Sequence, residues 1–505
     1  MDETGDSHPR RWAILAVICF ALLVVVIDVT VLHVAAPAIS EDLDPTALQL
    51  LWIIDVYPLV AAPLLVTSGV LGDRLGRKRL LLSGMALFGL ASIGATVAPS
   101  AEALIAARAV LGIAGAIIMP PTMAIIRDVF RDRDERVRAV GIWSAVSAGG
   151  AAVGPLIGGF LVEHFWWGAV FLINVPIVVG IFPVAVRLLP ESRAAEPPPW
   201  DGLAMAATVI GILGLAFGLK EGARYGFIEA KVVVSLLIAA GCLSWFTRRQ
   251  LRASEPLLDV RLFARRDFTV AVGCVLLSMF GLVGIEFFGA QYLQLVLGLE
   301  PFGAALRLLP LMLSTLAGGL LAARVLGRLG TRWTISLGLA GTAIGLIPML
   351  FLGLADQYLL LWPSFLVIGF ALEVALVAAN DVIISSVPAD EAGQAAAIEE
   401  TAYELGGGFG VAVLGSILAI VYTNRIGPIE GISGTGIENA RESLARALEI
   451  ADQASSSIAG SLIETAKLAF MSGYHTAIAV AIAMVGVSAG FAAVLLRSRR
   501  GSIRG

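Results

Sequence analysis

The sequence predicts an all-α integral membrane protein that crosses the bilayer fourteen times. Of the 505 residues, 58% are hydrophobic and only 15% are charged, whereas an ordinary soluble protein carries about 25% charged residues. The mean hydropathy of +0.88 points the same way. Runs of about 20 apolar residues, the length that crosses the hydrocarbon core, recur along the whole chain. The bilayer must therefore solvate most of the surface of this protein.

Fourteen apolar runs account for the predicted spans. The first resembles a signal peptide in position, but it is longer than a typical h-region and many spans follow, so we expect it to stay in the mature protein. The spans are expected near 13–36, 50–71, 80–98, 103–126, 139–162, 167–188, 202–219, 232–247, 268–291, 304–324, 333–354, 360–385, 396–422 and 472–496.

Basic residues predict the orientation. They gather before the first span, after spans two, four, eight and ten, and at the end of the chain, which puts them all on one side when the count is even. Because cytoplasmic loops are rich in Arg and Lys, both termini are expected in the cytoplasm, with the chain in a bacterial cytoplasmic (inner) membrane. The basic residues include Arg10, Arg74, Lys78, Arg131, Arg252, Arg328 and Arg497, and the opposite loops carry Glu41, Asp42, Asp44, Glu102, Glu163 and Asp356.

Two connections are longer than the rest. Residues 189–200 contain Pro197, Pro198 and Pro199, a composition typical of a stiff linker. In residues 424–471, apolar side chains recur at helical spacing on both sides of a serine run, which predicts a small helical hairpin outside the membrane.

An internal repeat divides the predicted spans into two sets. The segment 70–77, Val-Leu-Gly-Asp-Arg-Leu-Gly-Arg, recurs weakly at 325–332, in each case after the second span of a six-span set. Such repeats are typical of transporters built from two related halves. We therefore expect an N-terminal half at 1–188, a linker with two inserted spans at 189–266, and a C-terminal half at 267–505.

The loop after the second span carries the first recognisable motif. Gly69-x-Leu-x-Asp73-Arg74-x-Gly-Arg77-Lys-Arg resembles the loop signature of the major facilitator superfamily, which implies that fold. The resemblance implies that Asp73, Arg74 and Arg77 lock two helix ends in one conformation, and Asp128 is a candidate partner for Arg77. An ordinary positive-inside loop is the alternative.

Two further motifs resemble elements of the drug-exporting branch of this superfamily. Gly154-Pro155-x-x-Gly-Gly in the fifth span resembles the antiporter signature of the drug-exporting branch. Small residues let helices approach closely, and proline removes a backbone donor, so simple packing is part of any role here. Arg108, followed by Gly112, resembles an element of the fourth span that is linked to proton transfer, although the sequence also permits a place near the membrane surface.

The first span narrows the resemblance further. Asp28-Val-Thr-Val-Leu-His33, together with Trp52-Ile-Ile-Asp55-Val-Tyr57, is similar to the fourteen-span drug/proton antiporter family, and to its subgroup that exports quaternary ammonium compounds and dyes. The resemblance covers nearly the whole chain. It implies export of small lipophilic cations in exchange for protons, with fluoroquinolones as a further candidate class.

Acidic residues within the spans are the candidate functional groups. A carboxylate in hydrocarbon costs free energy, so its presence there indicates a function. A buried acid can hold either a proton or a cation, as an exchanger requires. The family resemblance makes Asp28 the leading proton-coupling acid, with Arg108, His33 and Asp55 as candidates beside it. For Asp55, Asp381 and Glu399 a position at the membrane interface is the simpler alternative. The expected substrate-binding residues are Glu286, Glu373, Glu399, Glu400, Glu404 and Tyr57.

Other functional classes find no support in the sequence. No phosphate-binding Gly-x-x-x-x-Gly-Lys-Ser/Thr loop, catalytic constellation or metal-ligand cluster occurs, and the arginines do not form a nucleic-acid-binding face. We expect a secondary transporter without cofactors that works as a monomer among membrane lipids. Export of an endogenous amphiphile, such as a lipid or siderophore, remains the second hypothesis.

Overall fold

The computed structural model describes residues 9–193, 201–254, 256, 258–387, 392–427, 434–453 and 456–496, and this part of the chain contains helices but no strand. Fourteen helices are long and apolar enough to cross a membrane. The predicted fold class and number of spans are confirmed. The linker residues Pro197, Pro198 and Pro199 lie outside the described residues.

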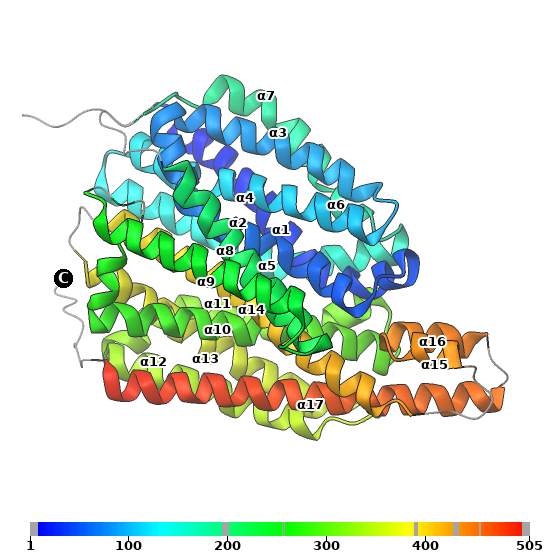
Figure 1. Ribbon diagram of the computed structural model, residues 1–505. Coiled ribbons are helices and arrows are strands. Elements are labelled where there is room, and N and C mark those ends of the chain that lie inside the picture. Colours follow the sequence, from blue (N-terminus) through cyan, green and yellow to red (C-terminus); the bar gives the residue numbers. More distant parts are fainter. Residues whose placement is uncertain are drawn as a thin grey trace, which may run out of the picture.

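Three groups of helices follow one another along the chain (Figure 1). The first six spans are α1 (Arg11–Leu43), α2 (Ala47–Leu75), α3 (Arg77–Thr96), α4 (Ala101–Val129), α5 (Arg133–His164) and the pair α6 (Ala169–Leu172) and α7 (Asn174–Leu188). The inserted spans are α8 (Gly202–Tyr225) and α9 (Ala230–Arg252), followed by the short η1 (Val260–Ala264).

The last six spans repeat the plan of the first six. They are α10 (Arg266–Gln291) with the π turn η2 (Tyr292–Val296), α11 (Pro301–Leu329), α12 (Thr331–Leu346) with η3 (Ile347–Phe351), α13 (Tyr358–Ser385), α14 (Ala392–Arg425) and α17 (Ser456–Leu495). Two short helices, α15 (Gly434–Ala440) and α16 (Leu444–Asp452), precede the last span.

Glycines at equivalent places end the second span of each half. Gly76 after α2 has φ of 112°, and Gly330 after α11 has φ of 72°. Both values lie in the left-handed region, which only glycine enters without strain. The weak repeat found in the sequence therefore has the same turn in both copies, although the second copy lacks the Asp.

The helix pairs that join the two halves include α2 with α14, α5 with α11 and α1 with α10. A Cβ atom added to Gly159 of α5 would lie 2.8 Å from the Cα atom of Phe302 in α11, so this contact depends on a small residue. Gly154 plays the same part within the first half, where a Cβ atom would overlap the Thr30 hydroxyl of α1. The glycine-rich stretch of α5 thus packs against both halves.

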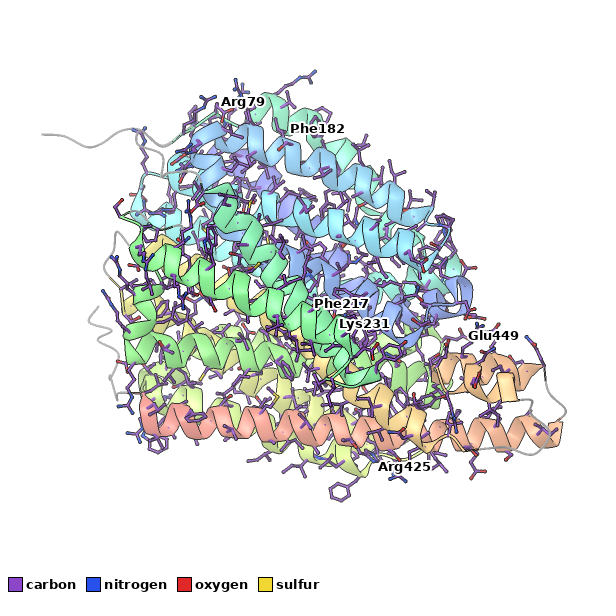
Figure 2. The ribbon with its side chains drawn as sticks, in the orientation of Figure 1. Arg79, Phe182, Phe217, Lys231, Arg425 and Glu449 are labelled. Atoms are coloured by element: carbon purple, nitrogen blue, oxygen red, sulfur yellow. The ribbon has the colours of Figure 1, made fainter. Side chains whose placement is uncertain are left out.

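The inserted helices lie across the boundary between the halves. α8 packs against α9, and it also contacts α2 of the first half and α14 of the second. The outer face of α9 is apolar and open to the surroundings, with Leu237 and Ile238 exposed. Figure 2 labels Phe217 of α8 and Lys231 of α9 on the face of the bundle that these two helices cover.

The start of α1 and the end of α17 lie at the same end of the bundle. Asp44, just after α1, forms an ion pair with Arg446 of α16, so the start of α1 lies at the opposite end, where α17 also finishes (Figure 1). We call that end the terminus side, and the end that carries α15 and α16 the far side.

The segment at 424–471 differs from the predicted hairpin. α16 packs against α17 as two hairpin arms would, but the second arm is not a separate helix. α17 runs without a break from Ser456 into the membrane and is 40 residues long. The polar stretch before residue 472 contains no proline that would end the helix. Both predicted arms are thus helical, but the second arm is continuous with the last span instead of being a separate helix.

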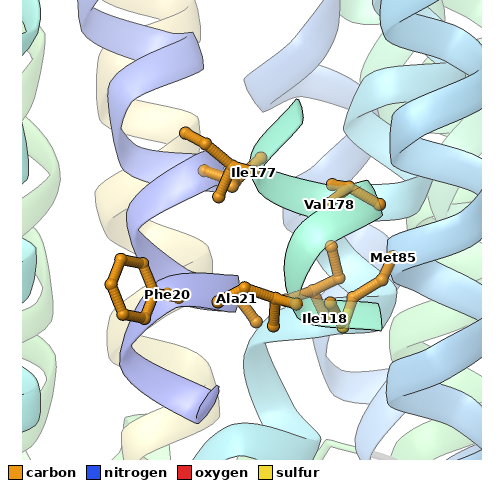
Figure 3. A pocket seen from close by; sticks show the side chains of 8 residues that line it. Phe20, Ala21, Met85, Ile118, Ile177 and Val178 are labelled. Atoms are coloured by element: carbon orange, nitrogen blue, oxygen red, sulfur yellow. The ribbon is translucent and has the colours of Figure 1, made fainter. Parts of the chain in front are cut away.

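A small gap between α1, α3, α4 and α7 shows how tightly the first half is packed (Figure 3). Its volume is about 10 Å³, and only apolar side chains such as Phe20, Met85, Ile118 and Val178 line it. A gap of this size and polarity is a packing defect that offers no polar partner to a ligand.

Candidate functional site

A buried carboxylate with two donors lies in the middle of the first half. Asp28 of α1 is 0% exposed. One oxygen accepts from Arg108 Nη1 at 2.5 Å, and the other accepts from Asn174 Nδ2 at 2.9 Å. Asn174 Nδ2 also lies 3.3 Å from Ser92 Oγ. A buried carboxylate is tolerated when a cation and further donors satisfy it, as they do here.

Arg108 links this carboxylate to two other helices. It lies in the first third of α4 and is 1% exposed, so its side chain is enclosed by protein. Its Nε atom donates to the Ile53 carbonyl of α2 at 3.2 Å. Its guanidinium lies 4.8 Å from the Tyr57 ring centre, at a distance that permits a cation–π interaction. One side chain therefore connects α1, α2 and α4.

Tyr57 occupies a packed position beside Arg108. It is almost fully buried and its hydroxyl has no hydrogen-bond partner in the structure. Gly112 and Gly115 of α4 make room for it, since a Cβ atom at Gly112 would lie 2.6 Å from the Tyr57 carbonyl oxygen. Tyr57 stays a candidate substrate contact, and in the structure its ring packs from α2 against α4.

His33 reaches the second half from α1. Its Nδ1 atom lies 3.7 Å from a carboxylate oxygen of Glu286 in α10. The His33 ring is buried and lies 6.3 Å from the Phe287 ring. The contact joins a proton-coupling candidate of the first half to a substrate-binding candidate of the second.

The acids of the second half surround Tyr403 of α14. Its hydroxyl lies within electrostatic range of Glu286, Glu373, Glu400 and Glu404, and 43% of its surface is exposed. Glu399 accepts a hydrogen bond from Asn380 and lies beside Glu400. The structure therefore brings the predicted acids of α10, α13 and α14 into one cluster.

The acid cluster faces the first half across the boundary. Tyr57 lies within electrostatic range of both Glu400 and Glu404, and Glu404 lies within range of Arg108. Among the described residues, no Arg or Lys lies within ion-pair distance of the acids in this cluster, and Glu286 has only His33. Several carboxyl groups in a poorly solvated region need protons or a cationic ligand to balance them.

A second buried ion pair occupies the other side of α2. Lys220 Nζ of α8 lies 2.7 Å from Asp55, and both side chains are 0% exposed. The ammonium group also lies 3.7 Å from the Trp52 ring centre. Asp55 is thus enclosed by protein and paired with a cation, whereas Asp381 is exposed near the end of α13.

The motif loop on the terminus side forms a cluster of ion pairs. Arg77 lies 2.9 Å from Asp73 and also contacts Asp128, which was its expected partner, while Arg74 is exposed. Glu191, beyond α7, accepts from the Lys78 amide at 3.2 Å and lies 3.5 Å from Arg79. The arrangement fastens the ends of α2, α3, α4 and α7 together.

Three residues of the site were not predicted from the sequence. Asn174 and Ser92 are common in transmembrane helices, and nothing in their local sequence points to Asp28. Lys220 carried a signal, because it is a cation at the end of an apolar run and a lone lysine there requires a partner. Its partner is 165 positions away, so no local pattern identified Asp55.

The family model described as Major Facilitator Superfamily matches residues 18–411. The chain belongs to the major facilitator superfamily. It is 39% identical to the multidrug efflux pump LfrA of Mycolicibacterium smegmatis, over 98% of both chains. It is 38% identical to the methyl viologen resistance protein SmvA of Salmonella typhimurium, over 94% of this chain and 96% of that protein. The resemblance drawn from the motifs is therefore confirmed, and the protein is a drug efflux transporter rather than an enzyme.

Solved structures of this superfamily share its fold. A bacterial homologue of the human lysosomal transporter Spinster, in an inward-facing and unoccupied conformation, superposes with a TM-score of 0.66 at 19% identity. That match covers 96% of this chain and 98% of the other. A D-xylose–proton symporter superposes with a TM-score of 0.60 at 14% identity, covering 96% of this chain and 98% of that one.

Proposed function

We propose that this transporter is a proton-coupled antiporter that exports lipophilic cationic drugs, dyes and quaternary ammonium compounds by alternating access. Fluoroquinolones are a further candidate class. The observation that carries the proposal is the pairing pattern at the centre. The acids of the first half each have a buried cation, whereas the cluster around Tyr403 has no Arg or Lys among the described residues.

The proton arm of the mechanism uses Asp28. In the structure its charge is balanced by Arg108, and Asn174 donates a hydrogen bond to it. A proton arriving on Asp28 removes the charge that holds the guanidinium, and Arg108 is then free to turn towards Glu404, the acid of the second half within its electrostatic range. Protonation of Asp28 in the first half in this way changes the charge environment of Glu404 in the second half.

The cation arm uses Glu400 and Glu404, which are four residues apart on α14 and share one face of that helix. A lipophilic cation placed between them and Glu286 would gain Coulombic attraction in a poorly solvated site. The exposed ring of Tyr403 offers a face for a delocalised cation. A cation and Arg108 compete for Glu404, so arrival of protons favours release of the cation.

The structure corresponds to a state that is closed on the far side. There, Asp44 pairs with Arg446, and Glu163 accepts from the Phe302 amide at 3.2 Å. Deeper in the bundle, Gln294 Nε2 of η2 donates to the Val34 carbonyl of α1 at 3.0 Å. These contacts join the two halves and would have to open for release on that side.

Export of an endogenous amphiphile with the same coupling is the second candidate. Two relatives support it by name: the tetracenomycin C resistance and export protein of Streptomyces glaucescens, 32% identical, and a probable actinorhodin transporter of Streptomyces coelicolor, 34% identical. The acid cluster favours a cationic substrate over a neutral one.

The proposal extends to placement in the cell. We place the protein in the bacterial cytoplasmic membrane with the terminus side in the cytoplasm, because the basic loops gather there. A functional monomer with halves at 1–188 and 267–505 and an inserted unit at 189–266 completes the proposal.

The experiment is ethidium transport into proteoliposomes under an imposed pH gradient, with the internal pH followed in parallel. Ethidium accumulating against its own gradient while protons flow in the opposite direction supports cation/proton antiport. Asp28→Asn protein in matched liposomes provides the uncoupled control.

If neither ethidium nor protons move with folded protein, cation antiport is contradicted and the endogenous-amphiphile candidate becomes the leading one. If ethidium moves without protons, export stands but the assignment of Asp28 to coupling fails.

A further inference from the structure

The ion pair between Asp55 and Lys220 has no place in the mechanism above, although it is among the most buried charged groups of the molecule. Lys220 belongs to neither six-helix half, because it lies near the end of the inserted helix α8. An inserted pair of spans that only filled space against the lipid would not require a buried charge. The pair therefore calls for an explanation.

The contacts of α8 leave open which half it follows during transport. It packs against α2 of the first half and against α14 of the second. A small apolar cluster of Leu59, Ile212 and Ala216 joins α8 to α2, and Leu405 and Phe409 of α14 pack against the same cluster. When the two halves rock, α8 must slide against one of these neighbours. The Asp55–Lys220 ion pair joins α8 to α2, not to α14.

The same stretch of α2 is held from its other side by the proton site. Arg108 Nε donates to the Ile53 carbonyl at 3.2 Å, and Lys220 donates to the Asp55 carboxylate at 2.7 Å. Only two positions separate the two acceptors. A change in the hydrogen bonds of Arg108 thus acts directly on the segment of α2 to which α8 is attached.

We propose that Lys220 is a positioning residue for transport, which fastens the inserted helices to α2 through Asp55 so that they move with the first half. In this arrangement α8 and α9 brace α2 while Arg108 changes partners, and the sliding surface lies between α8 and α14. The proposal deepens the proposed antiport, because it adds the inserted spans to the coupling machinery.

The charged groups of the neighbouring helices do not replace this contact. On α8 the adjacent Glu221 pairs with Lys231 of α9. On α4, Arg108 is directed to Asp28 and Ile53, and on α14 the acids Glu400 and Glu404 face Tyr57 rather than Asp55. Lys220 is thus the cation that balances Asp55 within the described residues.

A cavity on the far side borders Lys220. It has a volume of about 570 Å³ and lies where α2, α8, α14 and α15 meet, with Leu51, Lys220, Ser416 and Glu438 in its wall. Its presence at the end of the buried pair allows α8 and α14 to shift against each other without opening a void in the packed core.

Stability alone is a weak reason for this pair. Replacing a buried ion pair by apolar residues of similar size is often neutral or stabilising, whereas removing one partner is strongly destabilising. A double variant that removes both charges therefore separates a positioning role from a structural one. The pair Glu221–Lys231, at the same end of the inserted helices (Figure 2), supplies a matched control because Lys231 is half exposed.

The experiment compares Lys220→Met, Lys220→Arg, the double variant Asp55→Asn/Lys220→Met, and the control Lys231→Met. We expect the maximal rate of ethidium exchange to fall about tenfold in Lys220→Met and to be partly rescued in Lys220→Arg, with ethidium binding changed less than about threefold. The double variant should regain the thermal stability of the wild type but keep the slow exchange. A double variant that exchanges as fast as Lys231→Met would overturn the proposal.

A distance measurement tests the same idea without transport. Three exposed residues on the terminus side can carry spin labels: Leu203 of α8, Leu75 of α2 and Leu329 of α11. The Leu203–Leu75 distance should be single and constant between pH 5 and pH 8, and should broaden in Lys220→Met and in the double variant. An unchanged narrow distribution in those variants would refute the attachment, even if ethidium proves not to be a substrate.

Discussion

Arg108 donates to Asp28 at 2.5 Å and to the Ile53 carbonyl at 3.2 Å, so a single guanidinium joins the acid of α1 to the backbone of α2. A backbone carbonyl in the middle of a helix normally accepts from the amide one turn further along. Its additional use by Arg108 gives α2 a contact that depends on where the guanidinium points. A proton on Asp28 can therefore alter the packing of α2 without any contact between that helix and the proton.

Asp28→Asn should abolish proton-driven exchange and retain binding of lipophilic cations. The amide keeps the shape of the carboxylate but cannot exchange a proton, and it leaves Arg108 free for Glu404. Ethidium binding to purified protein and ethidium exchange in proteoliposomes measure the two properties separately. Full exchange at the normal rate would remove Asp28 from the coupling role.

Replacing the acids of α14 should weaken cation binding. Glu400→Gln and Glu404→Gln each remove one charge from the cluster around Tyr403, and we expect the Kd for ethidium to rise about tenfold for each, or about 1.4 kcal/mol. Glu438→Gln, an exposed acid of α15, serves as the control for net charge. Equal effects of all three variants would show that the cluster has no special affinity for cations.

Gly154→Ala should block transport through sterics alone. A Cβ atom there overlaps the Thr30 hydroxyl, so α1 and α5 must separate. Gly149→Ala lies on the same helix with nothing within 4 Å of its added Cβ atom, and it should exchange normally. Ethidium exchange and thermal stability of the two variants make the comparison, and equal activity would show that α1 and α5 can separate without loss.

Asp356 should not contribute to the pH dependence of transport. Its hydrogen bonds with Arg307, at 2.6 and 2.7 Å, hold the pKa of Asp356 below its usual value of 3.8. A lowered pKa in the folded state means that the stabilisation is present above about pH 4 and is lost as the pH falls further, through the folded pKa. The carboxylate thus stays charged between pH 5 and pH 8.

The variant Asp356→Asn tests this reasoning. The shape of its pH–rate profile between pH 5 and pH 8 should match that of the wild type. Because half of the Asp356 side chain is exposed, any loss of thermal stability should be small and should fade as the pH falls from about 4 through the folded pKa. A shifted profile would place Asp356 among the coupling groups.

Removing an ion pair from the motif loop should weaken the contact between the ends of α2 and α4. Asp128→Asn removes one of the two acids that hold Arg77, so the ends of α2 and α4 should separate more readily. We expect faster labelling of a cysteine placed at Leu75, measured with a membrane-impermeant maleimide, after Cys19, Cys242 and Cys274 are replaced. Labelling as slow as in the parent would show that Asp73 alone is sufficient.

Much of the fold could be predicted because hydrophobicity and basic loops constrain it strongly. The fourteen spans and the motif loop each depend on residues close together in the sequence, and the repeat at Gly76 and Gly330 follows from local turn chemistry. That the last span and the polar stretch before it form one helix, α17, was not predicted, because hydropathy registers only the part of a helix inside the bilayer.

The site was harder to predict than the spans. The acids themselves are visible in the sequence because carboxylates are rare in apolar runs, but their partners depend on which helices touch. Asn174 reaches Asp28 across 146 positions, and Lys220 reaches Asp55 across 165. Whether an acid is paired, as Asp55 is, or lacks a nearby cation, as Glu400 does, is set by tertiary packing and leaves no trace in local sequence.

The length of α17 has a consequence for experiments on intact cells. Its 40 residues correspond to about 60 Å of helix, roughly twice the hydrocarbon thickness of a bilayer. With α16 packed along it, this helix forms a rigid projection on the far side. Such a projection is a suitable epitope for an antibody fragment, which would add mass and an orientation mark for single-particle imaging while leaving the acids of α10 and α14 uncovered.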